Sequence, residues 1–388
     1  MIVQELRKIF AVKRLFMILI LGILFYLLFF QKNVGIPAYN SDRIQLDVSG
    51  ELKGAYGKEL DKKEFQELSH TAADPEKSEI DRWIQSNPEF QELGIKSYRD
   101  LLARQDSLSD AVGGSLTSQI SARFTEGEQQ DALNRIWKDD YLAELMQAYD
   151  MEVSSGRPSS YDSEQLKQKQ TRMEERNQEE VYSLMPDRVM RNYLSILPDF
   201  AIFLILSVVL LVVPYSVKDT MEKVHLLQYG SKNGCNFYWK KGAAVLISAA
   251  LLCFAEFGLL AVMLNRNGAF PFLDCFVSGF GNPFLSFMKL TFGQYIGLSL
   301  AYVMLMGLSL AMITYCLSNC AHNYISAIAL QIPVVIFGIV VSLIFLPHFA
   351  EITQNIALLF FILLSFALAA AIGNVVRFLS IQYYDQMD

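Results

Sequence analysis

Two side chains that can exchange protons or hydrogen bonds lie inside long apolar segments of this sequence. Glu256 stands in the run CFAEFGLL, and Gln331 stands in the run IALQIPVV. A carboxylate in hydrocarbon costs about 3 kcal/mol, so Glu256 should face other helices or a water-filled cavity. Two roles remain open for it. Glu256 either belongs to a substrate path or cation relay, or is a protonated acid hydrogen-bonded to Gln331 or a serine.

Other chemistry-bearing residues do not form a recognisable catalytic or metal-binding pattern. Cys316, Cys320 and His322 form a C-x3-C-x-H cluster, but zinc needs a fourth ligand and this spacing is not standard. Neither H-E-x-x-H nor G-x-S-x-G occurs. The phosphate-binding pattern G-x4-G-K-[ST] is also absent, since Gly57-Lys58 is followed by Glu59. We therefore predict no catalytic residue, no metal and no cofactor, and any ATP-dependent work requires a second protein.

The polar stretch 215–241 has the features of a short helix between two apolar segments. Asp219 can cap a helix whose third residue is Glu222, and Gly230 can end it one turn after Leu226 and Leu227. Such a helix is what a partner protein would need in order to push on membrane helices. An ordinary connecting loop with solvated charges is the alternative.

These residues are distributed over six apolar segments. The chain has 388 residues, of which 52% are hydrophobic, and a helix needs roughly 20 apolar residues to cross a bilayer. Five segments crowd into the second half, which argues against core helices of a soluble protein. The fold class is therefore predicted as an α-helical membrane protein with six transmembrane helices. The segments are 15–30, Phe200–Val213, Ala243–Leu264, Leu290–Leu317, Tyr324–Leu346 and Ile356–Val376.

A long acidic stretch separates the first apolar segment from the second. Residues 33–196 hold 31 Asp and Glu against 20 Lys and Arg, and they contain no cysteine. Disulfides therefore do not stabilise this domain, and its charge would repel nucleic acid. Its pattern is mainly helical, apart from a possible strand at Ile44, Leu46 and Val48. Helices are predicted near 62–69, 76–86, 97–103, 108–125, 129–150 and 163–183.

Basic residues near the membrane set the predicted orientation. Lys and Arg gather in the N-terminal flank, in the stretch 215–241 and at Arg377. We therefore expect a multi-pass plasma-membrane protein with cytoplasmic termini and an extracellular acidic domain. The first apolar run lacks a convincing cleavage site and is interpreted as a retained anchor, not a signal peptide. The predicted divisions are an interfacial helix at 1–14, a span at 15–31, the extracellular domain at 32–196, five spans within 197–378 and a tail at 379–388.

The first residues have the pattern of a basic amphipathic helix on the inner membrane surface, in contact with lipids. Its polar face is expected to include Glu5, Arg7, Lys8 and Lys13. A frayed charged flank is the alternative. The predicted apolar face consists of Ile2, Val3, Leu6, Ile9 and Phe10.

Three features together resemble ABC-2-type transporter permeases. They are the N-terminal MIVQELRKIF before the first span, the domain that follows this span, and the pattern E-x3-LL-x2-G-x10-K from Glu222 to Lys241. The family often has an Arg after the glycine, where this chain has Ser231-Lys232. The resemblance implies six spans per subunit, a dimer of permeases and a separate ATP-hydrolysing subunit. It also implies a coupling role for the inner helix, carried here by Asp219, Glu222, Leu226, Leu227 and Gly230.

We therefore expect a permease subunit of an ATP-binding-cassette transporter that moves a bulky substrate, such as a peptide, a lipid or a drug-like molecule. Its expected partners are a separate ATPase subunit, a second permease subunit and membrane lipids. The alternative is a membrane-anchored sensor or scaffold whose extracellular domain binds a ligand or an envelope partner.

Overall fold

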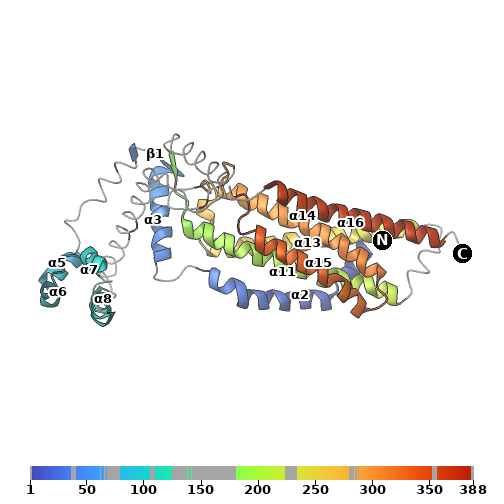
Figure 1. Cartoon of the computed structure of the whole chain (residues 1–388), viewed down its shortest axis with the longest axis horizontal. Coiled ribbons are helices and arrows are strands. Elements are labelled where there is room, and N and C mark those ends of the chain that lie inside the picture. The colour runs from blue at the N-terminus through green and yellow to red at the C-terminus, as the bar shows by residue number, and fades with distance from the viewer. Residues whose placement is uncertain are drawn as a thin grey trace.

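The protein is an α-helical bundle with an inserted domain after its first span (Figure 1). The computed structural model describes residues 2–35, 41–61, 63–64, 67, 79–104, 110–124, 138, 141, 181–222, 234–278, 284, 286, 288–351 and 356–385. Within these residues, six helices are long and apolar enough to cross a membrane, which confirms the predicted number. The spans are Val12–Asn33, Asp187–Lys218, Phe237–Arg266, Phe292–Cys320, Tyr324–Phe345 and Ala357–Ser380.

Helices α11 and α14 form the centre of the bundle. Helices α13, α15 and α16 pack around α14, and α15 also packs along α11. Helix α2 lies against α11 at the edge (Figure 1). In the most apolar window of each helix, 72% of α11 is buried but only 11% of α2, so α11 is a core element and α2 a peripheral one. The bounds are α2 Val12–Phe25, α11 Asp187–Met221, α13 Gly234–Arg266, α14 Phe292–Cys320, α15 Tyr324–Phe345 and α16 Ile356–Asp385.

Local sequence signals account for several helix ends. Thr291 and Gln294 form a reciprocal capping box at the start of α14, and Asn323 and Ser326 form another at the start of α15. Helix α2 continues into a π-helical turn, η1 (Tyr26–Phe30), and a 3₁₀ turn, η2 (Gln31–Asn33). The short helix α1 (Ile2–Ile9) precedes α2 and packs mainly against α13.

The two ends of the bundle differ in what they carry. The beginning of α1 and the end of α16 lie at one end, which we call the terminal side, and α3 crosses the opposite end, which we call the domain side (Figure 1). An even number of spans returns the chain to the side on which it began.

A buried polar network fastens α13, α14 and α16 together. The Tyr238 hydroxyl donates a hydrogen bond to Asn374 Oδ1 at 2.7 Å, and Asn374 Nδ2 donates to the carbonyl oxygen of Met312 at 3.0 Å. The Tyr315 hydroxyl donates to the carbonyl oxygen of Tyr238 at 3.0 Å. Asn374 is only 1% exposed, so water cannot replace these bonds.

Replacing Asn374 by Leu should therefore destabilise the bundle by about 1–3 kcal/mol, because it removes the acceptor of the buried Tyr238 hydroxyl. Thermal unfolding of the detergent-solubilised protein measures the effect. The control is Val376→Leu on the same helix, whose side chain is 60% exposed and should leave the transition unchanged. An unchanged midpoint for Asn374→Leu would contradict this assignment of the network.

The inserted domain is mainly helical in the residues that are described. Three predicted helices are confirmed as α5, α7 and α8, and the short helix α6 is additional. Of the predicted helices at 62–69 and 129–150, only residues 63, 64, 67, 138 and 141 are described, and these are helical; most of 163–183 lies outside the described residues. Residues Val181–Ser183 are an exception to the helix prediction, because they form strand β2 and pair antiparallel with β1. The bounds are α3 Ser41–Tyr56, β1 Glu59–Asp61, α5 Glu79–Ser86, α6 Pro88–Glu92, α7 Tyr98–Arg104, α8 Asp110–Phe124 and β2 Val181–Ser183.

The strand predicted at Ile44, Leu46 and Val48 is wrong, because these residues lie within helix α3. Ile44, Val48 and Leu52 are spaced by four residues and are all buried, which is the helical and not the extended period. Arg43 and Asp47 form an i,i+4 ion pair on the exposed surface. Leu46 lies between Ile44 and Val48, so the three apolar residues recur at every second position, which is also the period of a strand.

The inserted domain is fastened to the connection between α13 and α14. Lys53 of α3 forms an ion pair with Asp274 and donates to the carbonyl oxygen of Pro271. The Ser183 hydroxyl donates to the carbonyl oxygen of Phe276 at 2.9 Å. This connection includes the 3₁₀ turn η4 (Phe270–Phe272). The domain therefore rests on the loop that joins two spans.

Candidate functional site

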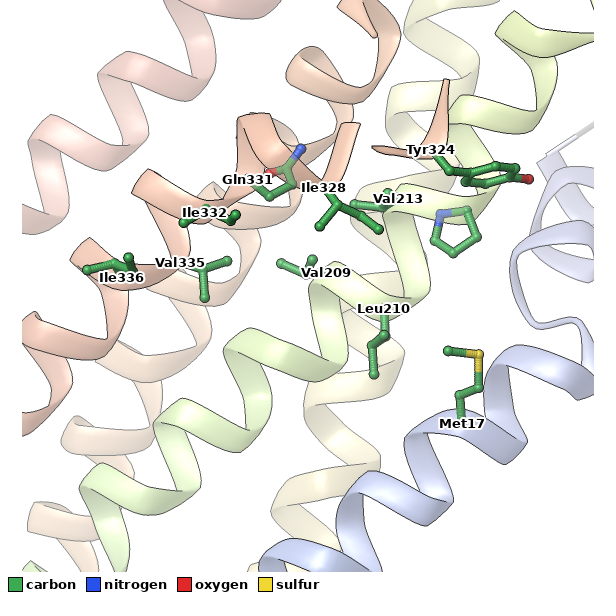
Figure 2. Close-up of a pocket in the computed structure, with 11 residues that line it drawn as sticks. Met17, Val209, Leu210, Val213, Tyr324, Ile328, Gln331, Ile332, Val335 and Ile336 are labelled. Carbon is green, nitrogen blue, oxygen red and sulfur yellow. The ribbon is translucent and has the colours of Figure 1, made fainter. Parts of the chain in front are cut away.

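An apolar groove lies on the terminal half of the bundle between α2, α11 and α15 (Figure 2). Its volume is about 430 Å³, within the usual range of roughly 300–1,000 Å³ for sites that bind small molecules. It is lined by Met17 of α2, by Val209, Leu210, Val213 and Pro214 of α11, and by Tyr324, Ile328, Gln331, Ile332, Val335 and Ile336 of α15.

The groove is open along one side. The α15 side chains of Ile328, Ile332 and Ile336 line it and are more than half exposed. They recur every four residues, so they form one stripe along the helix. From Tyr324 to Ile336 the helix rises about 18 Å, compared with a hydrocarbon thickness of roughly 30 Å. The groove thus extends from the terminal-side interface to the middle of the membrane.

Gln331 supplies the amide group of the groove. Its Nε2 lies 3.3 Å from the carbonyl oxygen of Thr314 and 3.3 Å from Ser318 Oγ, and it donates to both. These bonds hold α15 to α14. Its Oε1 is buried and has no hydrogen-bond partner among the described residues. Because this oxygen is closed off, the groove presents an almost wholly apolar surface to a ligand.

Glu256 faces the interior of the bundle, as expected from the cost of exposing it to hydrocarbon. Its side chain is 3% exposed and lies on α13, which contributes no residue to the lining of the groove. Ser207 of α11 lies beside the carboxyl group, although neither carboxyl oxygen makes a hydrogen bond of regular geometry within the described structure. Gln331 Nε2 bonds to α14 and not to Glu256, so of the two hydrogen-bond partners that the sequence suggests, only a serine lies beside the carboxyl group.

The predicted helix start at Asp219 is wrong. Helix α11 continues through Asp219 to Met221, and Glu222 is the residue that follows its last turn. Lys218 and Glu222 form an i,i+4 ion pair at 3.6 Å, and both side chains are more than half exposed. Because the two residues are four apart, their ion pair lies on one face of α11 and stabilises its last turn. Glu222 therefore belongs to the end of α11 and not to the first turn of a new helix.

The remaining residues assigned to coupling lie outside the described part of the chain. These are Leu226, Leu227 and Gly230. The chain is described again from the start of α13 at Gly234. Residues 222–234 join α11 to α13 in the sequence, and we call this stretch the coupling segment after the role that the sequence resemblance implies for it.

Sequence reasoning missed the role of Glu5. It was expected on the polar face of the N-terminal helix, but its side chain is only 3% exposed. The Tyr215 hydroxyl of α11 donates to Glu5 Oε2 at 2.7 Å, and Lys8 Nζ donates to Glu5 Oε1 at 2.8 Å. Only the position of Ile9, four residues later and also buried, could have indicated this face.

The cluster of Cys316, Cys320 and His322 does not gather further ligands among the residues that the structure places. No group of three or more His, Cys, Asp or Glu side chains in the described ranges could hold a metal ion. Cys316 is buried, whereas Cys320 is exposed at the end of α14.

Comparison with known proteins assigns the chain to a family. The profile described as ABC-2 family transporter protein matches residues 14–387, which is nearly the whole chain. No curated protein and no solved structure matches it. The six apolar helices and the match over almost the full length agree with each other. The chain belongs to the ABC-2 transporter family and is the membrane-embedded component of an ABC transporter.

Proposed function

We propose that this chain is a permease subunit that works with a separate ATPase and a second permease subunit. In this proposal the terminal side is cytoplasmic and the inserted domain is extracellular. The groove between α2, α11 and α15 receives a bulky apolar or amphipathic substrate, such as a lipid, a peptide or a drug-like molecule.

The observation that carries this proposal is that α11 both lines the groove and leads into the coupling segment. Val209 and Pro214 line the groove, and α11 ends at Met221. The distance from Pro214 to the helix end is about 10 Å along the axis. Because Pro214 and the helix end belong to one continuous helix, we expect a push on the coupling segment to move this wall of the groove.

Charge and composition of the groove support the substrate class. Gln331 is the amide-bearing residue of an otherwise apolar lining, so the groove suits a substrate with an apolar body and few polar groups. A small inorganic ion would find no set of oxygen ligands there. The open side of the groove would be closed by lipid or by the second permease subunit.

The direct test is purification of the chain from its own membrane. We expect a free-standing ATPase to accompany it, and the reconstituted pair to move a fluorescently labelled phospholipid or a labelled amphipathic peptide when ATP is supplied. The proposal fails if no ATPase accompanies the chain under conditions that preserve the complex.

Replacing Glu256 by Gln tests whether this residue belongs to the transport path. We propose that Glu256 only packs α13 against α11, because it lies outside the groove and beside Ser207. The amide of Gln has nearly the same shape and can still donate to Ser207, so transport should stay within about twofold of the wild type. Transport by reconstituted vesicles measures this. A loss of transport with a changed pH profile would instead assign Glu256 to a cation relay.

A further inference from the structure

A carboxylate on the N-terminal helix is buried against the two helices that flank the coupling segment. Glu5 of α1 accepts hydrogen bonds from Tyr215 of α11 and from Lys8 of α1. Lys241 of α13 is 5% exposed, and its positive charge acts on the same carboxylate. Glu5 thus bonds directly to α11, while α1 itself packs along α13 and places Glu5 within the electrostatic range of Lys241.

The position of Glu5 distinguishes α1 from a helix that only floats on the membrane surface. Glu5 and Ile9 form the buried face of α1, while Val3 is 76% exposed. A surface helix has no reason to bury its carboxylate, because burying a charge is costly unless it is paired. Replacing a buried ion pair by apolar residues often leaves the free energy of unfolding unchanged or raises it. The Glu5–Lys8 pair is therefore better explained by a role in positioning α1 than by a contribution to stability.

The groups that act on Glu5 flank the coupling segment on both sides. Tyr215 precedes the end of α11 at Met221, and Lys241 follows the start of α13 at Gly234. A second contact supports the same geometry, because the Arg14 guanidinium donates to the carbonyl oxygen of Leu211 at 3.4 Å. Arg14 also donates to the carbonyl oxygen of Lys8. Helix α1 therefore packs on α13 and α11, and the start of α2 is bonded to α11 on the same side of the bundle.

We propose that Glu5 is a positioning residue that holds α11 and α13 together at the coupling segment. A displacement of this segment is then passed to both helices and to α1 as one unit. Without the Glu5 contacts, α11 could shift without α13, and part of the motion would not reach the groove. This inference rests on the proposed function as an ATPase-coupled permease.

The Glu5 contacts are sensitive to pH. Burial raises the pKa of Glu5, but the hydrogen bonds from Lys8 and Tyr215 and the charges of Lys8 and Lys241 outweigh it and bring the pKa below its usual 4.5. A lowered pKa means that the contacts stabilise α1 above the pKa of the exposed acid. This stabilisation is lost as the pH falls through the lower pKa of the docked helix.

The first test is hydrogen exchange of the α1 amides in the full-length protein in lipid nanodiscs. Glu5→Gln keeps the side-chain shape but removes the charge, and should lower the protection of these amides about tenfold near neutral pH. Protection of the wild type, corrected for intrinsic exchange, should stay constant above the usual pKa of 4.5 and fall as the pH is lowered below it, while protection of the variant should not. The matched control is Arg7→Gln, which removes a charge from an exposed position of the same helix.

The second test is the amount of labelled phospholipid moved per ATP hydrolysed by the reconstituted complex. Glu5→Gln and Tyr215→Phe should each lower this ratio about threefold or more. The double variant should be no worse than either single variant, because both substitutions weaken or remove the same hydrogen bond between Tyr215 and Glu5. Arg7→Gln should match the wild type.

The outcomes separate the two proposals. If the wild-type chain recruits no ATPase, the proposed function fails, whereas the hydrogen-exchange result still reports on the Glu5 contacts. If the wild-type complex transports and Glu5→Gln transports equally well per ATP, the positioning role is wrong. It is also wrong if the protection of α1 is unchanged in Glu5→Gln.

Discussion

Replacing Ile332 by Trp is expected to block transport, with a loss of roughly tenfold or more, while insertion and assembly stay normal. Ile332 is 52% exposed and lines the apolar groove in its middle. A Trp side chain carries one of the largest apolar areas of any residue, so it would fill much of a groove of about 430 Å³. Because the site is open, the indole can enter it without displacing the core.

The matched control for this variant is Ile344→Trp on the same helix. Ile344 is 56% exposed but does not line the groove. Both variants should reach the membrane in equal amounts, and vesicle transport of labelled phospholipid should separate them. Transport at the wild-type level in both variants would mean that the groove is not the substrate path. Equal loss in both would point to a general requirement for the exposed face of α15.

Reversing the charge of Glu222 is expected to uncouple ATP hydrolysis from transport. Glu222 follows the last turn of α11, and its side chain is 54% exposed and available to a partner. Its ion pair with Lys218 lies at the surface, where such pairs contribute only about 0–1 kcal/mol. The fold should therefore tolerate Glu222→Lys, whereas an ATPase that recognises this carboxylate would not. We expect transport and permease-dependent ATPase stimulation to fall about tenfold.

A charge swap distinguishes partner recognition from helix stability. The double variant Lys218→Glu with Glu222→Lys restores an ion pair of the same spacing within α11. If the defect of Glu222→Lys came from the lost pair, the swap would repair it. If the ATPase reads the charge at this position, the swap remains uncoupled. Full activity of Glu222→Lys would remove this residue from the coupling role.

The spans were predictable from sequence because crossing a membrane depends on the length and composition of one continuous segment. The segment Tyr324–Leu346 was predicted to within one residue of helix α15, whose start is also encoded locally by the cap of Asn323. Helix α11 was less predictable. Its turns before Phe200 and after Val213 carry polar residues, and they are helical because they pack against other parts of the chain or continue the hydrogen-bonded ladder.

Short sequence patterns predicted the wrong secondary structure where the same few residues fit both the two-residue period of a strand and the four-residue spacing of a helix. Ile44, Leu46 and Val48 alternate like a strand, but Leu52 extends the four-residue spacing of α3. Asp219 is a residue type that often caps the start of a helix, yet here it lies inside the last turn of α11, which begins at Asp187. In each case the longer context, and not the local residue preference, decided the outcome.

The sequence by itself determined the membrane class, the six spans, the inserted domain and the absence of a phosphate-binding loop, since each depends on residues that are neighbours in the chain. The tertiary structure decided which helices meet. It brought Met17, Val209 and Ile332 to one groove and buried Glu5 beside Tyr215. These partners come from helices that are distant in sequence, and their contacts depend on how the helices rotate and pack against one another. No pattern within a single segment encodes that rotation.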